Sequence, residues 1–228
     1  RNVSFKYNKD AVKNILDGVN VKINSGETIG IIGSTGSSKS TLIQLIPRLY
    51  DPSEGEVIIG GNNAKDYTFE NLRGEISVVL QQNILFSGTI EDNLLWGKPE
   101  ATEEEMIEAA KDAQAHEFIE GFEKGYKTEL GQGGNTVSGG QRQRICIARA
   151  LLKKPKIIIF DDSTSAVDTA TDAKIRAALR SEKYSGITKI IVAQPITSIM
   201  DADRIIVIDD GKISAVGTHD ELTKNSEI

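Results

Sequence analysis

The sequence contains a single cysteine, Cys146, among its 228 residues. One cysteine excludes an internal disulfide framework and is typical of a reducing compartment. No apolar run approaches the roughly 20 residues that a membrane-spanning helix requires. Basic residues do not outnumber acidic ones, and the formal net charge of −6 argues against a nucleic-acid partner. Cys146 lies in an apolar-periodic stretch, where we interpret it as a small core residue.

The remaining composition is typical of a soluble domain, with 39% hydrophobic and 26% charged residues. Segments of β character alternate with helical ones, which favours an α/β fold with a largely parallel sheet. Thr102 is an expected helix N-cap because three acidic residues follow it. The expected strands are residues 3–7, 19–23, 28–32, 56–59, 76–80, 157–160, 189–192 and 204–208, with turns at Asp17-Gly18 and Ser25-Gly26. The expected helices are residues 41–49, 89–95, 102–115, 139–152 and 170–181.

A glycine-rich segment, GSTGSSKST, joins the expected strand 28–32 to the helix after it. Backbone N–H groups of such a turn, together with the helix N-terminus, surround phosphate oxygens. Lys39 adds a positive charge near the β- and γ-phosphates, and the Ser40 hydroxyl can bind Mg²⁺. We therefore predict a nucleotide-binding P-loop formed by Gly33, Ser34, Thr35, Gly36, Ser37, Ser38, Lys39, Ser40 and Thr41.

Two acidic residues, Asp161 and Asp162, end the apolar run 157–160. A run that is apolar at every position indicates a strand covered on both faces. The carboxyl end of such a strand is where α/β sheets place ligands. We predict that Asp161 orients Mg²⁺, although on its own the pattern also fits a strand that ends in a solvated turn.

A third signal, VSGGQ, precedes the expected helix 139–152. Small residues with unhindered N–H groups at a helix start favour a second anion-binding site, formed by Ser138, Gly139, Gly140 and Gln141. A generic Gly-Gly turn is the alternative. The longer stretch VSGGQRQRICIARALL closely resembles the signature of ATP-binding-cassette (ABC) ATPases.

The resemblance to ABC ATPases covers the whole chain, with the motifs in the family's order. It includes Walker A (33–41), the Q-loop (80–82), the signature (137–141), Walker B (157–162), the D-loop (165–168) and the H-loop (192–194). It implies roles for Tyr7 in stacking on adenine, Gln81 in Mg²⁺ binding and catalysis, Asp168 at the nucleotide, and Asp162 and Gln194 in catalysis. Residues 85–93 look like those of exporter cassettes.

The family implies a fold, and we expect the chain to follow it. The expectation is one ABC nucleotide-binding domain, 1–228, with a RecA-like P-loop core and an N-terminal antiparallel β subdomain. Residues 1–81 and 153–228 would form the ATP-binding core, and residues 82–152 an inserted helical subdomain. The family also implies MgATP held between two cassettes that dimerise head to tail and drive attached membrane domains.

Several positions depart from the family pattern. Serine replaces glycine at Ser38, which predicts crowding of the phosphates or strain if φ is positive. Aspartate replaces glutamate at Asp162, and glutamine replaces histidine at Gln194. We expect these changes to weaken hydrolysis, and the alternative is that Asp162 still acts through a shifted water. We have no functional account of Pro195, which replaces arginine and lacks an N–H. Gln132 stands where exporters carry a glutamate.

These departures resemble the degenerate subunit of heterodimeric bacterial exporters. We expect a site with slow or no hydrolysis and a signature that completes the competent site of a different partner cassette. The chain would sit at the cytoplasmic face of the membrane, continuing a longer protein with a transmembrane domain, and would be soluble when isolated. A non-hydrolytic ATP-gated dimerisation module and a soluble ABC-type ATPase are the alternatives.

Overall fold

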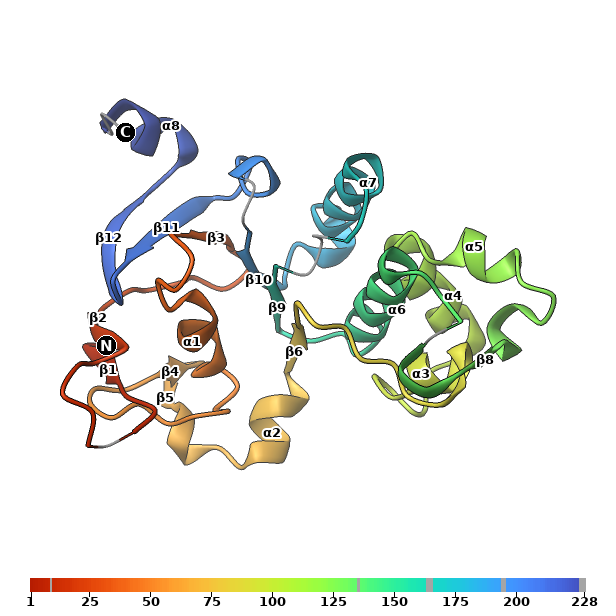
Figure 1. The fold of residues 1–228 in the computed structure, drawn as a ribbon, viewed down its shortest axis with the longest axis horizontal. Helices are drawn as coiled ribbons and strands as arrows, with labels where there is room; N and C mark the ends of the chain where they lie inside the picture. Colours follow the sequence, from red (N-terminus) through yellow and green to blue (C-terminus); the bar gives the residue numbers. More distant parts are fainter. Residues whose placement is uncertain (9, 135, 163–165, 194–195, 226–228) are drawn as a thin grey trace. The chain divides into compact units, whose positions relative to one another are not determined.

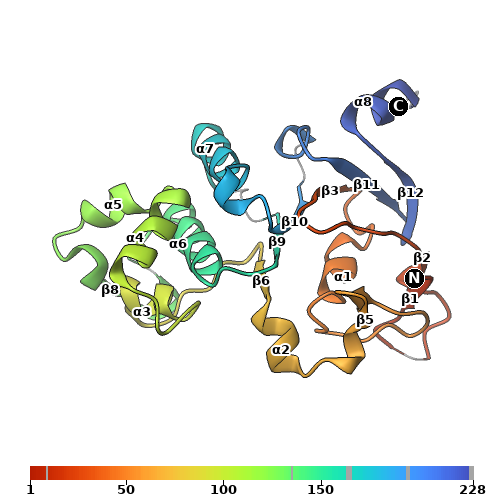
Figure 2. The same cartoon turned by 180° about the vertical axis from the view of Figure 1, so that it is seen from behind.

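The structure is a computed structural model that describes residues 1–8, 10–134, 136–162, 166–193 and 196–225. The chain divides into two compact units. The first unit comprises Arg1–Ile76 and Thr188–Ile228, and the second comprises Ser77–Ile187. Figures 1 and 2 show the elements of both units from opposite sides.

The first unit carries four neighbouring strands of the central sheet, in the order β12-β11-β3-β10. Strand β3 (Thr28–Ile32) pairs in parallel with β10 (Thr188–Val192) and with β11 (Arg204–Asp209), while β12 (Lys212–Gly217) pairs antiparallel with β11. The other elements of this unit are β1 (Val3–Phe5), β2 (Leu16–Val19), α1 (Lys39–Gln44), β4 (Ile58–Ile59), β5 (Asn62–Asn63), α2 (Phe69–Gly74) and α8 (His219–Asn225). The expected α/β fold with a mostly parallel sheet and an antiparallel β region is confirmed.

The second unit is mainly helical. Its longest helix, α6 (Gly139–Leu152), packs against α3 (Ile90–Leu95) and α4 (Glu103–Asp112), as both views show. Strands β6 (Ile76–Val79) and β9 (Ile157–Asp161) are neighbours in the central sheet. The unit also contains β7 (Gly88–Thr89), α5 (His116–Glu120), β8 (Glu129–Leu130) and α7 (Thr169–Leu179). Within the described residues, no helix combines the length and the apolar character needed to cross a membrane.

One expected strand, at residues 19–23, is wrong. The strand is instead β2, which includes the expected turn at Asp17-Gly18. Val3 pairs with Val19 and Phe5 with Leu16, so β2 holds one more residue than β1 between the two pairs. Gly18 has φ of 61°, and this bulge conformation breaks the alternation on which the prediction relied.

The helix after the P-loop is also shorter than the expected 41–49. Helix α1 ends at Gln44, and residues 45–48 form a turn. Pro47 has no N–H to donate to the carbonyl four residues earlier, and it disfavours helical dihedrals at Ile46. Helices α2, α5 and α8 and strands β5, β7, β8 and β12 were not expected from the sequence. Helix α6, by contrast, has the expected bounds.

The expected N-cap at Thr102 is confirmed. Thr102 Oγ1 accepts from the Glu105 N–H at 3.2 Å, and Glu105 Oε2 accepts from the Thr102 N–H at 3.3 Å, which completes a capping box. Glu105 also accepts from Lys98 Nζ at 2.8 Å and from Lys154 Nζ at 2.5 Å. These two lysines therefore tie the start of α4 to the segments before α4 and after α6.

The lysine cluster around Glu105 predicts a pH dependence of stability. Hydrogen bonds from Lys154 and then Lys98 lower the pKa of Glu105 from 4.5 to about 2. Because the folded-state pKa is depressed, this stabilisation is present above about pH 4.5 and is lost as the pH falls through about 2. Glu105→Gln should flatten the decline of the melting temperature across this window. Glu123→Gln is the control, because Glu123 is exposed, and an equal decline in all three proteins would contradict the prediction.

Candidate functional site

The P-loop follows the carboxyl end of β3, a strand that lies between β10 and β11 in the sheet. Gly33 lies so close to β11 that an added Cβ would be 2.1 Å from the Ile208 carbonyl oxygen. Only glycine fits this approach, because no real Cβ lies that near a backbone atom. The loop then runs through residues 34–38 into α1, which places the first N–H groups of the helix at the end of the loop.

The ammonium group of Lys39 lies inside this loop. Lys39 Nζ donates to the carbonyl oxygens of Gly33 and Ser34, each at 2.9 Å, and approaches Ser37 Oγ at 3.4 Å. The Lys39 side chain is only 8% exposed. A cation is therefore fixed among backbone groups at a helix start, an arrangement that favours a phosphate.

Ser38 has a strained backbone conformation, which was one of the two consequences expected of a serine at this position. Its φ is 75° and its ψ is 22°, in the left-handed region. For a residue with a Cβ this conformation costs roughly 1–2 kcal/mol relative to the right-handed one. Within the described residues its side chain makes no capping hydrogen bond to α1, so no such bond offsets the strain.

Two further P-loop residues lie on the first turn of α1. Ser40 is exposed and supplies a hydroxyl oxygen of the kind that Mg²⁺ prefers. Thr41 is buried, and its Oγ1 lies 3.0 Å from the hydroxyl of Tyr7. The Tyr7 ring packs edge-on against Phe5 and Tyr50, with centroid distances of 4.9 and 5.1 Å. Tyr7 is still 55% exposed, so part of its ring can meet a ligand.

The acidic part of the predicted site lies in the second unit. Asp161 is the last residue of β9 and is buried, whereas Asp162 follows in the left-handed region with φ of 47°. Gln81 Nε2 donates to Asp162 Oδ2 at 3.1 Å. The structure therefore brings two predicted residues, 81 amino acids apart, into direct contact.

Two donors of the second unit fit a magnesium ion. Asp161 offers a carboxylate and Gln81 an amide oxygen. Mg²⁺ is typically held by one or two carboxylates together with substrate phosphates and water. Within the described residues there is no group of three or more His, Cys, Asp or Glu side chains that could hold a metal alone. A hard cation that shares its ligands with a nucleotide fits these residues best.

The signature segment forms a helix cap. Ser138 is the N-cap of α6, and its side chain accepts from the Gln141 N–H at 3.2 Å. Gln141 Oε1 in turn accepts from the Ser138 N–H at 2.9 Å. This capping box leaves the N–H groups of Gly139 and Gly140 in the first turn, where an anion can approach them.

Asp168 has a structural partner. It is the N-cap of α7, and its Oδ1 accepts from the Thr171 N–H at 2.9 Å. This backbone hydrogen bond is the main cause that lowers the pKa of Asp168. A side chain engaged in this way orients the start of α7, and its predicted contact with nucleotide stays a prediction.

Some predicted features lie outside the described residues. These are Gln194 of the H-loop, Pro195 directly after it, Ser165 of the D-loop, and the side chain of Gln132. Gln143, a fully buried residue of α6, was not among the site residues predicted from the sequence. Its side chain contacts the segment before α7, and a polar residue inside an apolar helical face was the signal that could have identified it.

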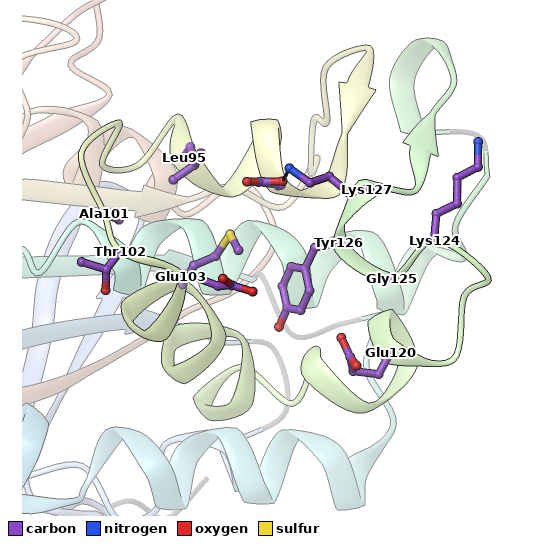
Figure 3. Close-up of a pocket in the computed structure, with 11 residues that line it drawn as sticks. Leu95, Ala101, Thr102, Glu103, Glu120, Lys124, Gly125, Tyr126 and Lys127 are labelled. Atoms are coloured by element: carbon purple, nitrogen blue, oxygen red, sulfur yellow. Dashed lines mark ion pairs between the residues drawn. The ribbon is translucent and has the colours of Figure 1, made fainter.

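A cavity of about 340 Å³ opens in the second unit, away from the predicted motifs. Tyr126 points into it, with Glu103 and Glu120 on either side (Figure 3). Burial raises the pKa of Tyr126 to about 12. The eleven described residues that line the cavity include none of the predicted nucleotide-site residues.

Comparisons with known proteins agree on one family. The family model described as ABC transporter matches residues 16–165. A protein of Bacillus subtilis (strain 168), YgaD, is 47% identical over 222 residues, which cover 97% of this chain and 38% of that protein. A protein of Staphylococcus aureus (strain NCTC 8325 / PS 47) is 47% identical over 220 residues, again 38% of its length. Both are named for multidrug export as ATP-binding/permease proteins.

A solved structure is similar across nearly the whole chain. A bacterial Atm1-family ABC exporter with ATP bound matches with a TM-score of 0.94 and 37% identity, covering 99% of this chain and 40% of that one. The chain thus spans about two fifths of the length of the relatives that it matches.

Proposed function

This chain belongs to the ABC transporter family, and we propose that it is the ATP-binding motor of an exporter, which binds MgATP at a head-to-tail interface with a second cassette. The observation that carries the proposal is the Lys39 ammonium held among P-loop carbonyls at the start of α1. That arrangement offers one cation and several backbone N–H groups to a polyphosphate. The names of the relatives support transport as the work that ATP drives.

Each group of predicted site residues has its own role in the proposed function. Residues 33–41 hold the phosphates, Ser40 and Asp161 hold Mg²⁺ with Gln81, and Tyr7 stacks on adenine. Ser138–Gln141 presents N–H groups to the nucleotide of the other cassette, and Asp168 lies beside that contact. Asp162 and Gln194 are the groups that would activate water at this chain's own nucleotide.

We further propose that the second cassette is a different, catalytically competent chain. The altered positions, Ser38, Asp162 and Gln194, all belong to the phosphate side of this chain's own site. The signature side is well formed, since Ser138 and Gln141 complete a capping box. Such a chain suits an asymmetric pair of cassettes, because its intact signature would contact the nucleotide bound to the partner cassette. Asp162, which is short and held by Gln81, also favours an ATP-gated dimerisation role with little turnover at this site.

An exposed apolar cluster supports a membrane-domain partner. Phe86 and Trp96 stack with ring centroids 4.4 Å apart, and they are 42% and 66% exposed. Ile84, in the same loop as Phe86, is 57% exposed. Adjacent exposed apolar side chains mark interaction surfaces. We propose that this cluster contacts the transmembrane domain of the same exporter, which places the chain at the cytoplasmic face of the membrane.

Tyr7 provides the test of the nucleotide site. Tyr7→Ala should weaken MgATP binding about fivefold in calorimetric titration of the full chain, because base stacking contributes about 1 kcal/mol at the low end of its range. Tyr7→Phe is the matched control, since it keeps the ring and removes only the hydroxyl near Thr41. Equal affinity in wild type and Tyr7→Ala would contradict the stacking role, and no MgATP binding by wild type would contradict the proposed function.

A further inference from the structure

Gln143 connects the signature helix to the segment that precedes α7. Its Oε1 accepts from the Ala166 N–H at 3.1 Å, across 23 residues of sequence. The Gln143 side chain is fully buried. Ala166 is two residues before Asp168, the N-cap of α7. One side-chain bond therefore joins the first turns of α6 to the start of α7.

The two signature glycines meet the same residue. An added Cβ at Gly140 would lie 2.8 Å from the Ala166 carbonyl oxygen, and one at Gly139 would lie 3.8 Å from the Ala166 Cβ. Gly139 and Gln143 are four residues apart and so share one face of α6. The missing side chain at Gly140 lets the Ala166 carbonyl approach the helix, whereas a Cβ at Gly139 would make an ordinary van der Waals contact. Gln143 then fixes the orientation of the Ala166 backbone.

This contact contributes little to stability. Gln143 Nε2 is buried and has no hydrogen-bond partner among the residues that the structure describes. An unsatisfied buried donor costs about 1–3 kcal/mol, whereas the single bond to Ala166 contributes about 1 kcal/mol. An apolar side chain of similar size would stabilise this position as well or better. The value of glutamine here therefore lies in the bond itself.

We propose that Gln143 is a positioning residue, which locks residues 166–168 to the signature turn so that the two move as one body when the signature closes on nucleotide. The proposal rests on the proposed function, because the closing surface is the one assigned to the partner cassette's ATP. Without the bond, the signature still binds nucleotide, but residues 166–168 no longer move with it. We therefore expect loss of the bond to lower the turnover rate and to leave MgATP binding unchanged.

The test compares three variants in the full-length exporter with both cassettes. Gln143→Met removes the acceptor, and Gln143→Glu keeps an oxygen at the same place. Ile147→Met is the matched control, because Ile147 is fully buried one turn further along α6. Amide exchange at Ala166, melting temperature, and kcat and KM for MgATP are measured in each.

Gln143→Met should accelerate exchange of the Ala166 amide and lower kcat, each about fivefold, the equivalent of one hydrogen bond, with KM unchanged. Its melting temperature should be no lower than that of Ile147→Met, and Gln143→Glu should keep the Ala166 protection and more of the kcat. The proposal would be overturned if the Ala166 amide of Gln143→Met exchanged at the wild-type rate. It would also be overturned if the kcat of Gln143→Met were no lower than that of Ile147→Met. Amide exchange measures the hydrogen bond between Gln143 and Ala166 whether or not ATP is hydrolysed. A wild-type exporter that does not hydrolyse MgATP would therefore contradict the proposed function alone.

Discussion

Replacing Asp162 by glutamate is expected to raise ATP hydrolysis at this chain's own nucleotide site by roughly 10- to 100-fold. A correctly placed general base contributes about 10²–10⁴-fold to such a reaction, and a displaced base forfeits much of it. The aspartate carboxylate is one methylene closer to the backbone than that of glutamate. It is also held by Gln81 Nε2 at 3.1 Å, which keeps it near the end of β9.

The same substitution should slightly destabilise the fold. Asp162 has φ of 47°, and aspartate tolerates the left-handed region better than glutamate does. We expect glutamate to lower the free energy of unfolding by a few tenths of a kcal/mol to about 1 kcal/mol. A variant that hydrolyses ATP faster but is less stable would show that aspartate at position 162 favours the left-handed backbone conformation at the expense of the hydrolysis rate.

The rate should be measured in single-turnover experiments on the full-length exporter, with the Walker B acid of the other cassette neutralised. Asp210→Glu is the matched control, because Asp210 also has positive φ, 42°, in the exposed β11–β12 turn. It should lower stability in the same way without any change in rate. An unchanged rate in Asp162→Glu would contradict the prediction. So would rapid wild-type turnover at this site that Asp162→Asn abolishes.

Ser38→Gly is expected to tighten MgATP binding about tenfold and to raise the free energy of unfolding by about 1 kcal/mol. The gain in stability follows from φ of 75° at Ser38, a conformation that glycine adopts without the Cβ penalty. The gain in affinity has a different cause. A side chain at this point of the loop competes with the approach of phosphate oxygens, and one charge-assisted hydrogen bond regained amounts to about 1.5 kcal/mol.

Strain and crowding can be separated by a second glycine variant. Asp210→Gly relieves the same left-handed strain, and it removes only an exposed ion pair with Lys13. It should raise the melting temperature as Ser38→Gly does, while MgATP affinity stays at the wild-type value. Calorimetric titration and thermal melts on the full chain measure both quantities. A stabilised Ser38→Gly variant with unchanged affinity would leave strain as the sole effect of the serine.

Local sequence patterns predicted α3, α4, α6 and α7 of the second unit to within a few residues, but they did not predict α5. Thr102 caps α4 as expected, and Ser138 caps α6, because a capping box depends on residues only three positions apart. Helix α6 has the expected bounds for the same reason. Strand β2 could not be predicted, since its extra residue is defined by pairing with β1 and not by its own alternation.

Motif spacing identified the residues of the candidate site but not their contacts. The sequence placed Lys39 after a glycine-rich turn, and the structure adds that its ammonium lies against the Gly33 and Ser34 carbonyls. It named Asp168 at the nucleotide, and the structure shows this side chain capping α7. The contact of Gln143 was not predicted, because its partner lies 23 residues away in the sequence.

The sequence by itself determined the family, the order of the motifs and the identities of the substituted residues, because these depend on residue type and spacing alone. Tertiary structure alone decided three further points. Ser38 adopts left-handed dihedrals, Gln81 holds Asp162, and Gln143 holds Ala166. The physical reason is common to all three. A dihedral angle at a loop-to-helix junction and a hydrogen bond between distant segments are defined by how whole elements pack, which local sequence does not encode.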